Sequence, residues 1–193
     1  MAIHVASRRR ARASIEAAHP GALIVDVTSR AEEPWVRLSP FYPHGGIPVP
    51  FTPGVTSWSV EGIWQALKVF ADEDVDPGRL AITSMKGIKR TVRKYGEVRG
   101  HRRGLAGAEL LPYERARREI YLPSYRWVLE HRAADLVAEL ARLGSEGDVV
   151  LLDYGTNGDV GDLSSPLSHA ALVRRHIEGP RADAPKARDA PAT

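Results

Sequence analysis

The chain has 193 residues, a formal net charge of +3 and 43% hydrophobic residues, which is typical of one globular domain. It contains no cysteine, which excludes disulfides, thiolate zinc sites and a cysteine nucleophile. No window reaches the roughly 20 apolar residues of a membrane helix, and no apolar stretch of signal-peptide length follows the basic N-terminus. We therefore expect a cytoplasmic protein with no membrane partner.

The first half of the chain is predicted to hold two helices, a strand and a long loop. Residues 4–18 are rich in Arg and Ala and predict a basic helical extension, and residues 22–28 predict a β-branched strand. Five prolines between 39 and 54 exclude a regular helix and indicate a binding loop, with a short edge strand at 47–51. Residues 58–72 then predict an amphipathic helix capped by Ser59.

The second half of the chain alternates between helical and strand patterns. We expect a short strand at 80–83, a basic helix at 86–95 and a flexible basic turn at 100–104. Helices are predicted at 111–122 and 125–143, kinked or divided at Pro123, and the second is predicted to end at Gly144. A buried strand at 148–154, a polar loop at 155–162 and a helix at 168–178 complete one α+β domain over 1–179, mostly helical with a small β-sheet. Residues 180–193 lack apolar side chains and are predicted to be disordered.

Three polar side chains share one face of the predicted 58–72 helix. Glu61, Gln65 and Lys68 follow the i, i+4, i+7 spacing that aligns side chains on a helix. Glu61 could stabilise a developing cation or act as a base, and Gln65 could orient a hydroxyl or carbonyl group. Lys68 could hold a phosphate or act as a nucleophile. The alternative is a solvated face with a weak pair of opposite charges.

Three other segments are candidates for binding. Phe41 and Tyr42 in the proline-rich loop could form a pocket wall or fill the core beneath it. The run from Asp153 to Asp159 follows a buried strand, as ligand-binding loops often do, but Asn-Gly and Gly-Asp also mark simple turns. Residues 86–103 carry many Lys and Arg side chains against one acid, which indicates either a phosphate or nucleic-acid surface or a solvated helix face.

Several familiar motifs are absent from the sequence. It contains no G-x-x-x-x-G-K-[ST], G-x-G-x-x-G, G-x-S-x-G or H-E-x-x-H pattern. His169 and His176 lie seven residues apart and could share a helix face, but such a pair is more often structural than metal-binding. We therefore expect neither a metal nor a cofactor.

The order of two motifs resembles a known family. L-S-P-F-Y-P at 38–43, followed by S-V-E-G-I-W-Q-A-L-K-V-F at 59–70, is similar to the opening of the NADAR or YbiA-like domain. The basic segment at 86–104, the helix at 111–122 and L-S-H-A-A-L-V at 167–173 are compatible with its later parts, so the resemblance spans residues 38–178. The sequence departs from the pattern at Gly62, at Tyr113 in place of a tryptophan, and at 154–159.

This resemblance implies an N-glycosidase. Known members hydrolyse phosphoribosylated pyrimidine intermediates of riboflavin biosynthesis or remove ADP-ribose from guanine bases. By resemblance, Glu61 matches the catalytic glutamate and Lys68 the lysine proposed to engage the ribose C1 centre, without a metal. The substrate-binding residues implied or proposed beside them are Phe41, Tyr42, Trp64, Gln65, Lys86, Arg102, Tyr113, Arg118, Asp153, Asn157 and Asp159.

The implied partner is a small-molecule nucleotide or an ADP-ribosylated nucleic acid, and the oligomeric state stays open. Two alternatives remain at this stage. One is a non-catalytic module that binds nucleotides or nucleic acids through residues 86–103. The other is a catalytically inactive relative that acts as an interaction protein.

Overall fold

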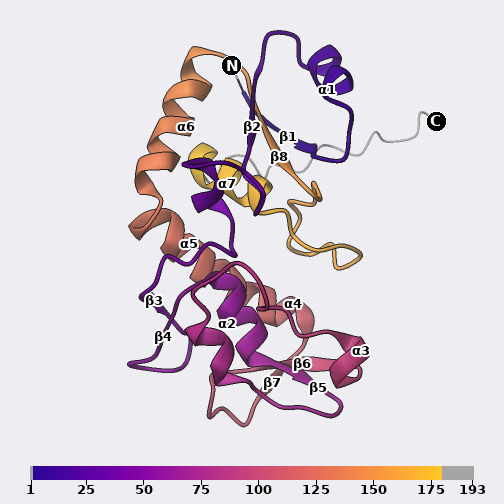
Figure 1. The fold of residues 1–193 in the computed structure, drawn as a ribbon, viewed down its shortest axis with the longest axis vertical. Coiled ribbons are helices and arrows are strands. Elements are labelled where there is room, and N and C mark those ends of the chain that lie inside the picture. Colours follow the sequence, from indigo (N-terminus) through magenta and orange to yellow (C-terminus); the bar gives the residue numbers. More distant parts are fainter. Residues whose placement is uncertain (1, 180–193) are drawn as a thin grey trace, which may run out of the picture.

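A computed structural model describes residues 2–179 of the chain (Figure 1). Its strands are β1 (Ile3–Ser7), β2 (Leu23–Asp26), β3 (Ile47–Pro48), β4 (Thr56–Ser57), β5 (Lys68–Phe70), β6 (Val98–Arg102), β7 (Leu110–Leu111) and β8 (Val149–Asp153). Its α-helices are α1 (Arg12–Ala18), α2 (Val60–Leu67), α3 (Val92–Tyr95), α4 (Tyr113–Ala116), α5 (Leu122–His131), α6 (Ala134–Glu146) and α7 (His169–Glu178). Two 3₁₀ helices, η1 (Trp35–Leu38) and η2 (Pro77–Ala81), and a π-helical turn, η3 (Arg117–Tyr121), complete the fold, which is α+β.

A three-stranded parallel sheet forms one end of the molecule. Its order is β1-β8-β2, so the strand from the C-terminal part of the chain lies between two strands from the first 26 residues. Alternate side chains of β8 enter two apolar clusters, because successive residues of a strand point to opposite faces. Val149 and Leu151 join the main core, whereas Val150 packs with Ala6 and with Ile15 of α1.

An antiparallel sheet forms the other end. Its order is β5-β6-β7, with Lys68 opposite His101 and His101 opposite Leu111. Helix α2 lies beside this sheet and buries Ile63, Ala66 and Leu67 in the main core (Figure 1).

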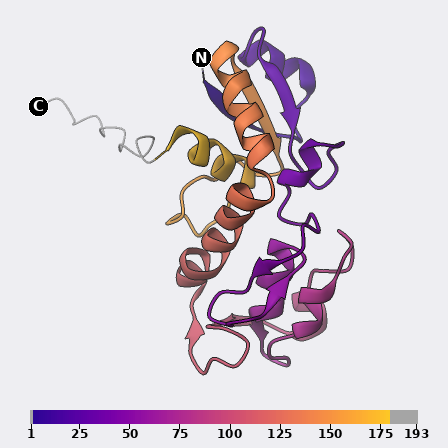
Figure 2. The same ribbon diagram turned by 90° about the vertical axis from the view of Figure 1, so that its left-hand side faces the viewer.

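The helical run from α4 to α6 links the two ends. Figure 2 shows α5 and α6 following one another along the length of the molecule. The π-helical turn η3 stands between α4 and α5, and π-turns of this kind are often found at functional sites. No helix within residues 2–179 has the length and apolar character needed to cross a membrane.

The structure corrects the predicted N-terminal helix. Residues 4–18 do not form one helix, because Ile3–Ser7 pairs along its whole length with β8 and only Arg12–Ala18 is helical. Residues 3–7 are therefore part of the parallel sheet rather than of a helical extension. The strand partner is far away in the sequence, so local composition could not reveal it.

The amphipathic helix predicted at 58–72 is shorter than expected. It runs from Val60 to Leu67, and Lys68 begins β5 because it pairs with His101. The guanidinium of Arg90 binds the carbonyl oxygens of Gln65 and Lys68 at this junction, at 3.3 and 2.6 Å. These bonds satisfy carbonyls that a longer helix would have used.

Several predictions in the middle of the chain are also wrong. Residues 80–83 are not a strand, since η2 ends at Ala81; the helix predicted at 86–95 is confined to 92–95; and the turn predicted at 100–104 overlaps β6. Pro123 does not divide two helices, because α4, η3 and α5 follow one another without a gap and Pro123 lies just after the π-helical turn η3. The break comes at 132–133, and α6 passes Gly144 to end at Glu146.

The other predictions agree in type with the structure. The strands at 22–28 and 148–154 correspond to β2 and β8, and the helix at 168–178 corresponds to α7. The edge strand expected at 47–51 is present as Ile47–Pro48, paired with β4. The predicted disorder of 180–193 lies outside the described residues.

Candidate functional site

Glu61 lies in the first turn of α2 and is almost completely buried. Ser59 caps the helix by accepting a hydrogen bond from the backbone N–H of Gly62 at 2.9 Å. The backbone N–H of Glu61 itself donates to the carbonyl of Pro40 at 2.9 Å, which fixes the start of the helix against the proline-rich loop. The side chain retains only 7% exposure, an unusual position for a carboxylate without a compensating charge contact.

A chain of hydrogen bonds holds the Glu61 carboxylate in one orientation. Gln65 Nε2 donates to Glu61 Oε1 at 2.8 Å, one helical turn away. Gln65 Oε1 accepts in turn from the backbone N–H of Arg90 at 2.9 Å. Gln65 therefore orients Glu61, as its i+4 spacing predicts, and its amide is itself fixed by the segment that precedes α3.

Lys68 and His101 face each other across β5 and β6, with Trp64 beside them. The rings of Trp64 and His101 lie with their centroids 3.7 Å apart. His101 is 1% exposed, and neither of its ring nitrogens has a hydrogen-bond partner among the described residues. The site thus contains a buried imidazole with unsatisfied polar atoms, which is an uncommon and costly feature.

Three polar atoms near Glu61 remain available to a ligand. Within residues 2–179, the fully enclosed side-chain nitrogens and oxygens without a partner belong to Arg90, His101, Arg117 and Arg174. Glu61 Oε2, Lys68 Nζ and the Tyr121 hydroxyl also lack a protein partner there, yet they are not fully enclosed. No ion-pair contact joins Glu61 to Lys68 in the described chain, so both groups keep their polar capacity for another molecule.

Burial shifts the pKa values of these groups toward their neutral forms. It raises the pKa of Glu61, although the Gln65 hydrogen bond and the charges of Lys68 and Lys89 oppose the change. Burial lowers the pKa of Lys68, with Glu61 opposing. Burial and the Lys68 charge lower the pKa of His101 to about 3, while the Trp64 backbone acts in the opposite direction. His101 is therefore neutral at physiological pH, and Glu61 holds a proton more readily than an exposed glutamate.

Aromatic side chains surround this polar group. Trp64 lies 5.6 Å from Tyr121 and 5.9 Å from Tyr113, measured between ring centroids. Tyr121 is the last residue of the π-helical turn, and burial, followed by the charge of Glu61, raises its pKa. The phenol is therefore a neutral hydrogen-bond donor across the physiological range.

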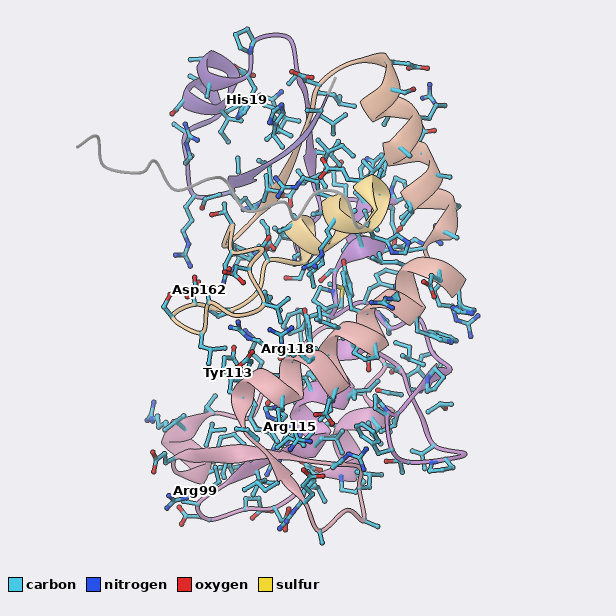
Figure 3. All side chains as sticks on the ribbon, turned by 180° about the vertical axis from the view of Figure 1, so that it is seen from behind. His19, Arg99, Tyr113, Arg115, Arg118 and Asp162 are labelled. Carbon is cyan, nitrogen blue, oxygen red and sulfur yellow. The ribbon has the colours of Figure 1, made fainter. Side chains whose placement is uncertain are left out.

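Arg117 organises the loop that follows β8. It is 2% exposed and donates to the carbonyl of Asp162 at 2.7 Å, to the carbonyl of Ser165 and to the Tyr113 hydroxyl at 3.0 Å. Figure 3 shows Tyr113 and Arg118 on the helical run, facing the loop that carries Asp162. The loop after β8 is therefore held against η3, next to the tyrosines.

Asp153 anchors the start of α7 and is not left available to a ligand. Its carboxylate accepts hydrogen bonds from Ser168 Oγ and the Tyr154 N–H, both at 2.7 Å, and lies 3.0 Å from His169 Nδ1. His169 Nε2 lies 2.8 Å from the carbonyl of Val27. Burial alone would raise the pKa of Asp153, but these hydrogen bonds and His169 hold it below its ordinary value.

The predicted basic surface at 86–103 is divided among structural roles. Arg90 is 4% exposed and caps the end of α2. Arg99 pairs with Glu97, Arg102 pairs with Asp74, and Arg103 lies 3.6 Å from Glu109 and Glu119. These ion pairs involve three of the eight Lys and Arg side chains of the segment, so part of its charge is compensated within the fold. The alternative of a nucleic-acid-binding module stays a prediction. Lys89 is the member of this segment that acts on Glu61 and Lys68, and its ammonium lies 5.2 Å from the Phe41 ring centroid.

Five predicted binding residues have other contacts. The Tyr42 hydroxyl donates to Glu33 at 3.1 Å, and its ring packs on His44. The side chains of the other four are exposed on the surface or bonded within their own segment. These are Lys86, Arg118 paired with Glu114, Asn157 bonded to the carbonyls of Asp162 and Ser165, and Asp159 in a turn with Gly161.

Sequence reasoning missed two members of the site. Tyr121 was hidden because a π-turn changes the angular spacing along the helix, so an α-helical periodicity places it wrongly. The sequence predicts a turn at His101, but in the structure it lies in β6, the central strand of the antiparallel sheet, between Lys68 and Leu111. Within residues 2–179, no three His, Asp or Glu side chains are grouped to hold a metal ion.

Comparison with known proteins identifies the family of this chain, and the function of that family is unknown. Residues 7–173 match the model of a family of unknown function, DUF6939. The chain belongs to this family, since the match covers most of its length. No curated protein matches the sequence.

Proposed function

We propose that the protein hydrolyses an N-glycosidic bond of a ribose-phosphate compound, either a riboflavin-pathway type of nucleotide intermediate or an ADP-ribose adduct. The observation that supports this most is the state of Glu61: buried, oriented by Gln65, and left with one carboxylate oxygen without a protein partner. The similarity of the 38–43 and 59–70 motifs to the NADAR or YbiA-like domain points to the same residue.

The chemistry of such a bond suits these groups. Breaking the bond between ribose C1 and nitrogen passes through an oxocarbenium-like state, which a nearby carboxylate stabilises. Glu61 Oε2 stabilises this cation and takes the proton of the attacking water, which forms the new C1–O bond. The departing base leaves with the electron pair of the C–N bond and takes up a proton from solvent, and Glu61 releases to solvent the proton that it took from the water. Lys68 Nζ and the Tyr121 hydroxyl orient the ribose oxygens.

The charge around the site favours an anionic substrate. Lys68 and Lys89 both act on Glu61, and Lys89 is exposed beside Phe41, where a phosphate can approach from solvent. The nearby aromatic rings of Phe41 and Trp64 offer surfaces for a planar base. The proposal needs neither a metal ion nor a redox cofactor.

The test is to incubate the full chain with phosphoribosylated aminopyrimidines and with ADP-ribosylated guanosine, and to detect the released base by mass spectrometry. Glu61→Gln keeps the shape and the hydrogen bond from Gln65 but removes the charge. We expect it to lower the rate by at least about 100-fold. Lys68→Met is expected to lower the rate similarly, whereas Glu139→Gln on α6 changes a surface ion pair and retains full activity. Full activity of Glu61→Gln, or no release from either substrate class, would refute the proposal.

A further inference from the structure

A pocket of about 640 Å³ lies between the β3–β4 hairpin, η2 and the end of α5. Its volume falls within the usual range for small-molecule sites. Neither Glu61 nor Lys68 lines it, so it is separate from the site described above. Its lining includes the apolar side chains of Leu80 and Leu105 and two larger side chains, Trp58 and Arg132.

Trp58 is held rigidly and yet is 43% exposed. Its backbone N–H donates to the carbonyl of Leu80 and its carbonyl accepts from the N–H of Gly45, both at 3.0 Å. A Cβ at Gly45 would lie 3.2 Å from the indole ring, so the bare α-carbon of this glycine packs against the ring. A large aromatic surface that is fixed and partly open is the usual anchor for a flat ligand.

Arg132 provides the charge at the pocket. Its Nε donates to the carbonyl of Gly45 at 3.2 Å, and its guanidinium lies 5.4 Å from the Trp127 ring centroid. No carboxylate in residues 2–179 forms an ion pair with it, because the nearby Asp135 is held by Arg37 at 2.8 Å. No acidic residue lines the pocket. The guanidinium therefore keeps the capacity for a two-pronged contact with a carboxylate.

The adjacent glycines, Gly45 and Gly46, shape this pair of side chains. Both have a left-handed backbone, with φ of +71° and +67°. A Cβ at Gly46 would lie 2.7 Å from Nη2 of Arg132, just as one at Gly45 would press on Trp58. In this turn, the absence of a side chain at Gly45 and at Gly46 leaves space for Trp58 and Arg132. This packing is a second observation, separate from the volume of the pocket.

We propose that this pocket binds a small planar aromatic carboxylate. The ring lies on the open surface of Trp58 and over the apolar lining, and the carboxylate pairs with Arg132. A flat apolar molecule without charge leaves Arg132 unused, and a simple anion leaves Trp58 exposed. Both parts of the ligand are therefore required for tight binding.

The test is isothermal titration of the full chain with 2-naphthoate, compared with 2-naphthamide, which lacks the charge, and with acetate, which lacks the ring. We expect saturable one-site binding of 2-naphthoate and at least tenfold weaker binding of the other two. Equal binding of 2-naphthoate and 2-naphthamide, or no saturable binding at all, would overturn the proposal.

Matched variants locate the binding. Trp58→Ala and Arg132→Met are each expected to weaken 2-naphthoate at least tenfold, and Arg132→Lys less than Arg132→Met. Arg142→Met, which removes a surface arginine paired on α6, serves as the control. Glu61→Gln is expected to bind as the wild type does, so the result is independent of the proposed hydrolysis. Undiminished binding by both Trp58→Ala and Arg132→Met, with circular dichroism showing that they are folded, also contradicts the proposal.

Discussion

The buried carboxylate of Glu61 is a functional feature that opposes stability. Its desolvation is only partly offset by one hydrogen bond and two nearby ammonium groups, and its pKa is raised as a result. Lys68 has the matching problem, with its pKa lowered by burial. Functional residues commonly lower the stability of the fold in this way, and substituting them can increase it.

We therefore predict that Glu61→Gln stabilises the fold by about 1–2 kcal/mol at pH 7, because it removes the desolvation cost of a buried charge that has no ion-pair contact. The sign follows from the raised pKa. The folded state favours the protonated form of Glu61, so the wild type carries no charge penalty below the unfolded pKa, near 4.5. The penalty, and with it the advantage of Glu61→Gln, grows as pH rises and is complete above the folded pKa.

Urea denaturation at pH 4 and at pH 7 measures the effect. The advantage of Glu61→Gln over wild type is expected to be small at pH 4 and larger at pH 7. Glu139→Gln, at an exposed ion pair, is the control and is expected to change little. An advantage that is equal at both pH values would show that the wild-type charge is not penalised.

At this scale the sequence predicted the pairs that depend on local spacing. The contact between Glu61 and Gln65 follows from i, i+4 geometry within one helix, and it is present at 2.8 Å. Lys68 was predicted to lie near Glu61 from its i+7 helical spacing, but Lys68 belongs to β5 rather than to the helix. His101 reaches the site through strand pairing, which no local pattern encodes.

Among the elements, strand β6 depends most on a single glycine. Gly100 has φ of +151°, and a Cβ there would lie 2.6 Å from the carbonyl oxygen of Leu111. The close approach lets β7 pair with β6 immediately beside His101. The strand that carries His101 opposite Lys68 therefore requires a residue without a side chain at this point.

We predict that Gly100→Ala destabilises the protein by about 2 kcal/mol or more, because the added Cβ forces the two strands apart and strains the backbone. Thermal unfolding followed by circular dichroism measures this loss. Gly147→Ala is the matched control, since nothing lies within 4 Å of its Cβ position and its backbone is extended. Equal melting temperatures for Gly100→Ala and wild type would contradict the close approach of β6 and β7.

Elements were predictable where their signals are local. The Ser59 cap and the apolar run of β8 identified a helix start and a buried strand. Strand β1 was mistaken for a helix, because its identity depends on β8, and the π-turn η3 breaks the period on which helix prediction relies. Pro123 is a further example. It was expected to interrupt the helix, but a helical run that begins earlier continues through it.

For the molecule as a whole, Asp153 ties together parts that are distant in the sequence. Through Ser168 and His169 it joins the end of β8 to α7, and His169 reaches the carbonyl of Val27 just after β2. The carboxylate is 5% exposed, so it has little access to water if its partners are lost. Removing its charge leaves buried donors without an acceptor.

We predict that Asp153→Asn lowers the free energy of unfolding by about 3 kcal/mol, because the buried donors around the carboxylate lose an acceptor. The pKa of Asp153 is lowered below 3.8, so its stabilisation is present above that value and is lost as pH falls through the folded pKa. The free energy of unfolding, measured by denaturation, is therefore expected to fall less between pH 7 and pH 3 for the variant than for the wild type. An unchanged stability at pH 7 would contradict this role.

The order β1-β8-β2 has a consequence for how the chain is made. Strands β1 and β2 leave the ribosome early, but their shared neighbour is residues 149–153. Until that segment emerges, neither strand has a partner in this sheet, and both edges stay unpaired. The sheet therefore assembles only after residues 149–153 have been synthesised, through contacts of long sequence separation that slow folding. A chain that lacks β8 therefore leaves the backbone N–H and C=O groups of β1 and β2 unpaired. Such groups can pair with another chain and promote aggregation.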